Sequence, residues 1–272
     1  MVYILLTLNS LLMILLPVLL GIWLVRRYQV GWKLFFIGAA GFIVSQVLHI
    51  PFNHFVLDPF VKGFLDQGET FGRILLAALL FGLSAGVFEE VTRYLFYYVR
   101  KSMREWDEGM MFGAGWGGIE AILLGLLAAT TAINVYIYQS GLIESLVPAA
   151  QLAGSSEAIA AAAQQIEELV NLPPWMFLLG AVERAIALIL HLSLSILVLQ
   201  AFVRKNIIWL FAAIGWHTLI DAIAVVGLLQ EWDPLLIEAA IGMPAVLIGL
   251  FIIRYFKPPD EAPEAEGDAA GS

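Results

Sequence analysis

The sequence predicts an all-α, polytopic membrane protein, a bundle of about seven transmembrane helices. Of its 272 residues, 61% are hydrophobic, and the mean hydropathy of +0.87 is far above that of a soluble domain. Long apolar runs recur along the chain at the length of about 20 residues that a helix needs to cross a bilayer. The alternating segments typical of membrane β-barrels are absent from the sequence. A helical bundle is therefore the predicted fold class.

Seven apolar segments satisfy this length requirement. The predicted helices run over residues 3–25, 33–52, 72–99, 110–138, 174–202, 207–229 and 235–255. We expect a single transmembrane domain over residues 1–257, because no fixed-period repeat divides the chain. Residues 258–272 combine acidic side chains with Pro, Ala, Gly and Ser, so we predict a disordered, acidic cytoplasmic tail there.

Two long connections are predicted on the outer side. The first, over 53–71, contains Pro59 and Gly63, residues that favour a loop. The second, over 139–173, contains Ser155 and Glu157 ahead of an alanine-rich run, a pattern that suits a helix start. That helix is weakly amphipathic, so it either lies on the membrane surface or serves as a plain linker.

The basic residues predict the orientation of the bundle. Most of them fall on one side if successive helices alternate in direction: Arg26, Arg27, Lys33, Arg100, Lys101, Arg104, Arg204, Lys205, Arg254 and Lys257. The opposite side holds only Lys62 and Arg73. Cytoplasmic connections are enriched in Lys and Arg, so we expect the N-terminus outside and the C-terminus in the cytoplasm. No separate basic patch exists, and nucleic-acid binding is not expected.

Charged side chains interrupt several of the apolar segments. Glu89 and Glu90 are adjacent, and Arg93 follows them within one helical turn. A charged residue near the bilayer centre costs roughly 2.5–3.5 kcal/mol on insertion scales, so such groups are functional candidates by default. The further embedded polar residues are Glu120, Glu183, Arg184, His191, His217 and Asp221. His49 and His54, in contrast, lie near the predicted outer boundary and are interpreted as interfacial hydrogen-bonding groups.

Four of these residues lie at one predicted depth. Glu89, Glu120, His191 and His217 each stand about 10 residues, or roughly 15 Å, from the predicted cytoplasmic end of their own helix. Random errors in burial would scatter in depth, whereas a shared site would not. The glycine-rich run 113–118 before Glu120 either lets this helix approach its neighbours closely or unwinds it.

Local spacings support a shared site. Arg93 is three or four residues from the paired glutamates, so it can hold one or both carboxylates on one helix face. Asp221 is four residues from His217 and can orient its imidazole. Arg184 is nearly aligned with His191 on one helix face, and Glu183 is predicted to serve packing or to pair with Arg184.

These residue types point to hydrolytic chemistry. Two histidines with carboxylates and no cysteine match a Zn²⁺ site with one open position, and a further glutamate can act as general base. Without a metal, Glu89 or Glu90 together with a histidine can still activate a water. The polar layer alone also admits a proton-coupled transporter, since buried Glu, His and Asp form proton relays, and a scaffold in which the polar groups only hold helices together.

The order of these motifs resembles a known family. The runs Glu89-Glu90-x-x-Arg93, Gly-Gly-Ile-Glu120, Glu183-Arg184 followed by His191, and His217-x-x-x-Asp221 are similar to those of the YhfC-type intramembrane metalloproteases. These belong to a wider group of type II CAAX prenyl endopeptidase-like, PrsW-like and APH-1-like membrane proteins. The resemblance is clearest over residues 72–230.

The resemblance implies an intramembrane peptidase that cleaves a membrane-anchored peptide or protein substrate, in a prokaryotic plasma membrane. It implies catalytic roles for Glu89, Glu90 and Arg93, with Glu89 as the expected base. It implies that Glu120, His191 and His217 bind metal, with zinc suspected, or contact the transition state. Asp221, Glu183 and Arg184 would support them. Because APH-1-like proteins are non-catalytic scaffolds, a scaffold stays the alternative within the same group.

Overall fold

The structure is a computed structural model that describes residues 2–68, 70–140 and 164–259, and throughout these ranges it contains helices and no strands. The first half comprises α1 (Val2–Tyr28), α2 (Trp32–Phe52), a π-helix (Asn53–Leu57), α3 (Asp58–Leu65), α4 (Phe71–Val99) and α5 (Trp106–Gln139). The second half comprises a 3₁₀ helix (Pro174–Leu178), α9 (Leu179–Val203), α10 (Ile208–Leu229) and α11 (Pro234–Tyr255). Seven stretches in these ranges are long and apolar enough to cross a membrane, which confirms the predicted fold class.

The predicted outer loop over 53–71 is wrong, because α2 continues through the π-helix into α3 as one helical stretch, Trp32–Leu65. The Asp58 N–H donates to the carbonyl of Asn53, five residues back, and this widened turn carries the chain past Pro59. Proline lacks an N–H, and Pro59 stands directly after the π turn, where the regular helical bonding is already interrupted. The proposed helix start at Ser155 lies outside the described residues, while residues 164–170 are helical.

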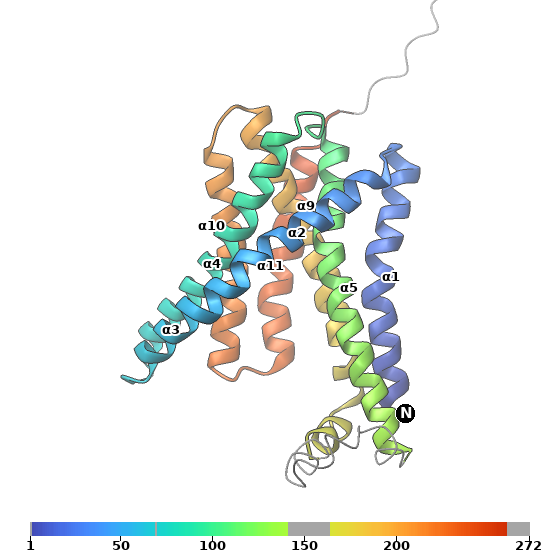
Figure 1. Ribbon diagram of the computed structural model, residues 1–272, viewed down its shortest axis with the longest axis vertical. Coiled ribbons are helices and arrows are strands. Elements are labelled where there is room, and N and C mark those ends of the chain that lie inside the picture. The colour runs from blue at the N-terminus through green and yellow to red at the C-terminus, as the bar shows by residue number, and fades with distance from the viewer. Residues whose placement is uncertain (1, 69, 141–163, 260–272) are drawn as a thin grey trace, which may run out of the picture.

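Helix α9 occupies the centre of the bundle. In its most apolar window 72% of the residues are buried, against 22–44% in the other six spans. It packs against α5, α10 and α11, and α2 crosses the bundle obliquely in front of them (Figure 1). A central helix that is apolar on most of its circumference provides the framework onto which the polar groups of neighbouring helices converge.

Glycines allow these helices to touch backbone to backbone. A Cβ added at Gly115 would lie 1.9 Å from the carbonyl oxygen of Phe35, and one at Gly117 would lie 2.8 Å from the imidazole of His191. The run 113–118 is continuous helix, so its glycines serve close approach and do not unwind α5. This contact brings Glu120 and Trp116, on α5, against α9 and α2.

Candidate functional site

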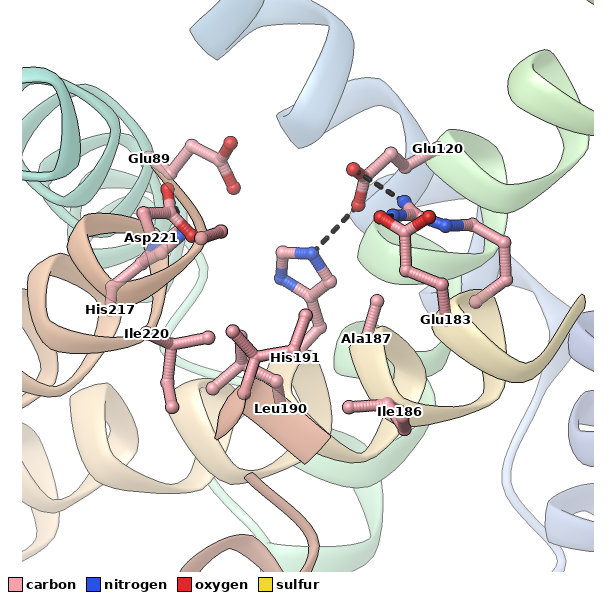
Figure 2. Close-up of a pocket in the computed structure, with 13 residues that line it drawn as sticks. Glu89, Glu120, Glu183, Ile186, Ala187, Leu190, His191, His217, Ile220 and Asp221 are labelled. Carbon is pink, nitrogen blue, oxygen red and sulfur yellow. Dashed lines mark hydrogen bonds and ion pairs between the residues drawn. The ribbon is translucent and has the colours of Figure 1, made fainter. Parts of the chain in front are cut away.

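A cavity of about 150 Å³ lies between α4, α5, α9, α10 and α11. Its polar lining is made by Glu89, Glu120, Glu183, Arg184, His191, His217 and Asp221. Its apolar lining comes from Ile186, Ala187, Leu190, Ile220, Ala224 and Ile241. Figure 2 shows Glu89 and His217 on one side of this cavity and Glu120 with Glu183 on the other. Polar side chains from four helices therefore surround one space inside an apolar bundle.

The first group of bonded residues joins α4 to α10. Arg93 Nε lies 3.0 Å from Glu90 Oε2, and both side chains are fully buried. His217 Nδ1 lies 2.9 Å from the other oxygen of Glu90, so Nδ1 carries a proton and donates it to the carboxylate. The Nε2 of the same ring lies 3.5 Å from Asp221 Oδ2. A buried carboxylate is stable only when it is paired and hydrogen-bonded, and Arg93 with His217 supplies both.

Arg93 extends this group to α9 and α5. Its NH1 donates to the His191 carbonyl at 2.9 Å and to the hydroxyl of Ser195, and its NH2 lies 3.3 Å from His191 Nδ1. Its guanidinium also stacks on the ring of Trp116 at 4.3 Å. Because a guanidinium can only donate, His191 Nδ1 is the acceptor and the ring proton is on Nε2.

The second group lies across the cavity. His191 Nε2 donates to Glu120 Oε2 at 2.9 Å, and Arg184 NH1 donates to Glu120 Oε1 at 2.8 Å. Arg184 NH2 pairs with Glu183. Figure 2 shows the bond between His191 and Glu120 as a dashed line. Glu120 is thus held by two donors and stays 26% exposed towards the cavity, whereas Glu90 is enclosed.

Glu89 differs from its neighbour Glu90. Its Oε1 accepts a hydrogen bond from Gln46 Nε2 at 3.1 Å, and its Oε2 accepts one from the indole of Trp116 at 2.9 Å. Each carboxylate oxygen has two lone-pair sites, so one site on each oxygen remains available. Glu89 lines the cavity. Of the two adjacent glutamates, it is the one that lines the cavity, while the two oxygens of Glu90 face Arg93 and His217.

The two groups meet at the histidines. The ring centroids of His191 and His217 lie 5.9 Å apart and the rings are nearly perpendicular. The prediction that Glu89, Glu120, His191 and His217 share one layer is confirmed by these contacts. The roles assigned to the individual residues stay predictions.

The site contains a group of side chains that could bind a metal ion. Glu89, Glu90 and His217 offer donor atoms that all lie within 4.8 Å of one another. Carboxylate oxygen and imidazole nitrogen are ligands that divalent hydrolytic metals accept, so these residues fit an ion. His191 lies outside this group; Arg93 faces its Nδ1 and Glu120 faces its Nε2. A metal held by Glu90 and His217 would replace the hydrogen bond between them.

Several residues at the site had been given no role from the sequence. Gln46 and Trp116 bond Glu89, and Ser195 bonds Arg93. A buried indole N–H normally finds an acceptor, so Trp116 beside an embedded glutamate was a usable signal. Gln46, a polar amide within an apolar helix, was a second usable signal. His49, interpreted as an interfacial hydrogen-bonding group, bonds Gln46 and Asn53.

Fold and site together define a polytopic integral membrane protein with a buried centre of carboxylate, imidazole and guanidinium groups. The chain belongs to the YhfC family: residues 12–239 match the family described as YhfC intramembrane metalloprotease. It is 33% identical over 226 residues to the "Uncharacterized membrane protein YhfC" of Bacillus subtilis (strain 168), covering 81% of this chain and 83% of the relative. No solved structure matches the chain significantly.

Proposed function

We propose that this protein is an intramembrane peptidase that hydrolyses a peptide bond of a membrane-associated substrate with a water activated by Glu89. One observation carries the proposal. Glu89 presents a carboxylate to a polar cavity within the bundle, and its two oxygens are fixed by separate donors, Gln46 and Trp116. A fixed carboxylate with free lone pairs is what a general base requires.

Glu89 takes the proton of the attacking water and passes it to the leaving amine. Glu90 and Arg93 fix the position of this part of α4 relative to α9 and α10. They do so through contacts to His217 and to the His191 carbonyl. His191 donates its only ring N–H, on Nε2, to Glu120 and accepts from Arg93 at Nδ1, so these two contacts fix its ring beside the cavity. Arg184 and Glu183 fix Glu120 in turn.

The residues that would hold a divalent metal are Glu89, Glu90 and His217. When bound, such an ion supplies Lewis acidity and lowers the pKa of a bound water to about 7. A carboxylate has two oxygens, so Glu89 can serve the ion with one oxygen and accept a proton with the other. Zinc is the proposed ion, because imidazole and carboxylate ligands suit it.

The substrate is proposed to be a membrane-anchored peptide or protein. A site enclosed by α4, α5, α9 and α10 within spans that cross a bilayer is reached most directly by a chain already in that bilayer. The Bacillus relative supports a prokaryotic plasma membrane as the location, with the N-terminus outside and the C-terminus in the cytoplasm.

The test is to map new peptide termini in membranes that contain the wild type or Glu89→Gln. The matched control is Glu167→Gln, which removes an exposed carboxylate outside the site. We expect a set of membrane-protein cleavages that is present with the wild type and with Glu167→Gln and is lost with Glu89→Gln. Identical termini with the wild type and Glu89→Gln would overturn the proposal.

A further inference from the structure

A row of hydrogen bonds leads away from Glu89 along α2. Gln46, His49 and Asn53 lie on one face of this helical stretch, and Ser84 faces them from α4. The successive distances are 3.1 Å from Gln46 Nε2 to Glu89, 3.3 Å from His49 Nδ1 to Gln46 Oε1, 3.0 Å from Asn53 Nδ2 to His49 Nε2, and 2.7 Å from Ser84 Oγ to Asn53 Oδ1. The row is continuous from the candidate base to Ser84.

The chemistry of its ends gives the row a direction. A carboxylate only accepts, so Gln46 turns its amide nitrogen to Glu89 and its oxygen to His49. His49 therefore carries its proton on Nδ1, and its Nε2 accepts from Asn53. The Asn53 oxygen accepts from the hydroxyl of Ser84. Every group therefore donates towards Glu89. The orientation of the Gln46 amide fixes the tautomer of His49, and that tautomer fixes the orientation of the Asn53 amide.

Packing holds this row in place. The ring of His49 stacks on Phe88, the residue before Glu89, with centroids 5.4 Å apart and an interplanar angle of 26°. Asn53 begins the π-helix, and single π turns inside longer helices occur frequently at functional sites. Ser84 is a buried residue of α4.

We propose that Gln46, His49, Asn53 and Ser84 form a one-way hydrogen-bond chain that positions the Glu89 carboxylate as the base, with Gln46 and His49 as positioning residues. The catalytic meaning of the chain rests on the proposed peptidase function. The existence and direction of this hydrogen-bond chain do not depend on the peptidase function, and they can be measured without any substrate.

The second donor on Glu89 makes the chain testable. Trp116 only donates, so in the variant Glu89→Gln the new amide has to turn its oxygen to Trp116 and its nitrogen to Gln46. Gln46 then has to present its oxygen to that nitrogen and its own nitrogen to His49 Nδ1. His49 becomes an acceptor at Nδ1, its proton moves to Nε2, and Asn53 reverses as well. One substitution at the site therefore switches the tautomer of His49.

The experiment is ring-nitrogen NMR of isotope-labelled histidine in the full chain, reconstituted in lipid nanodiscs. The protein has four histidines, and the variant His49→Gln identifies the signals of His49. We expect the Nδ1–H tautomer of His49 in the wild type and the Nε2–H tautomer in Glu89→Gln. The matched control is Glu120→Gln, which removes a carboxylate from the opposite side of the cavity and should leave His49 unchanged.

A second variant changes the hydrogen-bond chain at Asn53, on the far side of His49 from Glu89. Asn53→Asp replaces the donor to His49 Nε2 by an acceptor while Glu89 still turns the Gln46 oxygen to Nδ1. His49 should then carry protons on both ring nitrogens, and this variant serves if Glu89→Gln does not fold. A wild type in which His49 carries its proton on Nε2 would overturn the proposal. A folded Glu89→Gln protein in which His49 keeps Nδ1–H, or a folded Asn53→Asp protein in which Nδ1 has lost its proton, would overturn it too. Loss of cleavage in Glu89→Gln with no change in the tautomer of His49 would refute the hydrogen-bond chain and leave the peptidase proposal intact.

Discussion

His191 and His217 lie with their ring centroids 5.9 Å apart, yet each is bonded to a different glutamate: His191 to Glu120 and His217 to Glu90. The two imidazoles therefore belong to two separate polar groups that meet at one cavity. Arg93 connects the groups, because it touches both Glu90 and the ring of His191.

Metal content should distinguish the two possible ligand sets. We expect elemental analysis of purified wild type to find near-stoichiometric zinc, and Glu90→Gln or His217→Ala to lose most of it. His191→Ala should retain the metal, because His191 is not among the grouped donors Glu89, Glu90 and His217. Loss of zinc in folded His191→Ala and Glu120→Gln proteins, with retention in Glu90→Gln, would favour the set that the sequence predicted instead.

Removing Arg93 should strongly destabilise the bundle. Arg93→Ala leaves Glu90 fully buried without its cation, and breaking a buried pair from one side costs about 3–5 kcal/mol. The measurement is the free energy of unfolding in mixed detergent micelles. Arg184→Ala is the matched comparison and should cost less, because its partner Glu120 is partly exposed to the cavity. Equal losses for both variants would contradict this account.

Space beside His191 is tightly limited on the α5 side. Gly117→Ala adds a Cβ that would lie 2.8 Å from His191 Cδ2 and 3.0 Å from its Cβ. We expect a destabilisation of about 1–3 kcal/mol and a loss of cleavage through the displaced imidazole. Gly215→Ala, two residues before His217, meets nothing within 4 Å and should be neutral or slightly stabilising in the same unfolding assay. A fully active Gly117→Ala protein would show that the position of His191 is not critical.

The indole of Trp116 should support the reaction through Glu89. Trp116→Phe removes the donor to Glu89 Oε2 and keeps an aromatic ring beneath Arg93. A hydrogen bond to a charged group contributes about 1.5–3 kcal/mol, so we expect cleavage to fall by roughly tenfold or more. Trp106→Phe is the control, because it removes another buried indole donor, which bonds the Ile253 carbonyl and does not line the cavity. If both variants lose cleavage to the same extent, the effect is one of packing.

The sequence predicted the helical spans well because apolar length is a strong signal: α4 is Phe71–Val99, where residues 72–99 were expected. It also predicted the polar layer, since charge inside an apolar segment is rare enough to be informative. Depth along a helix could be counted, but rotation and tilt could not. Gln46 and His49 were therefore missed as partners of the site, because only the oblique path of α2 brings them to Glu89 (Figure 1).

The segment after Phe52 shows a different limit. Pro59 and Gly63 favour a loop by their local preferences, but the stretch is helical because Leu57 and Val61 bury their side chains against Ala77 of α4. Tertiary packing overrides local preference here, and no count of helix breakers would have indicated it. The π turn at Asn53, which lets the helix continue, likewise has no simple sequence signature.

The pairing of Glu90 with Arg93 inside a single turn of α4 bears on how the protein is made. During synthesis α4 leaves the ribosome well before α9 and α10, so the His217 and His191 contacts do not yet exist. The ion pair between residues three apart needs no other helix. The insertion machinery therefore receives a segment whose opposite charges already neutralise each other. The polar centre then assembles in stages, with the pair entering the bilayer first and its histidine partners arriving last.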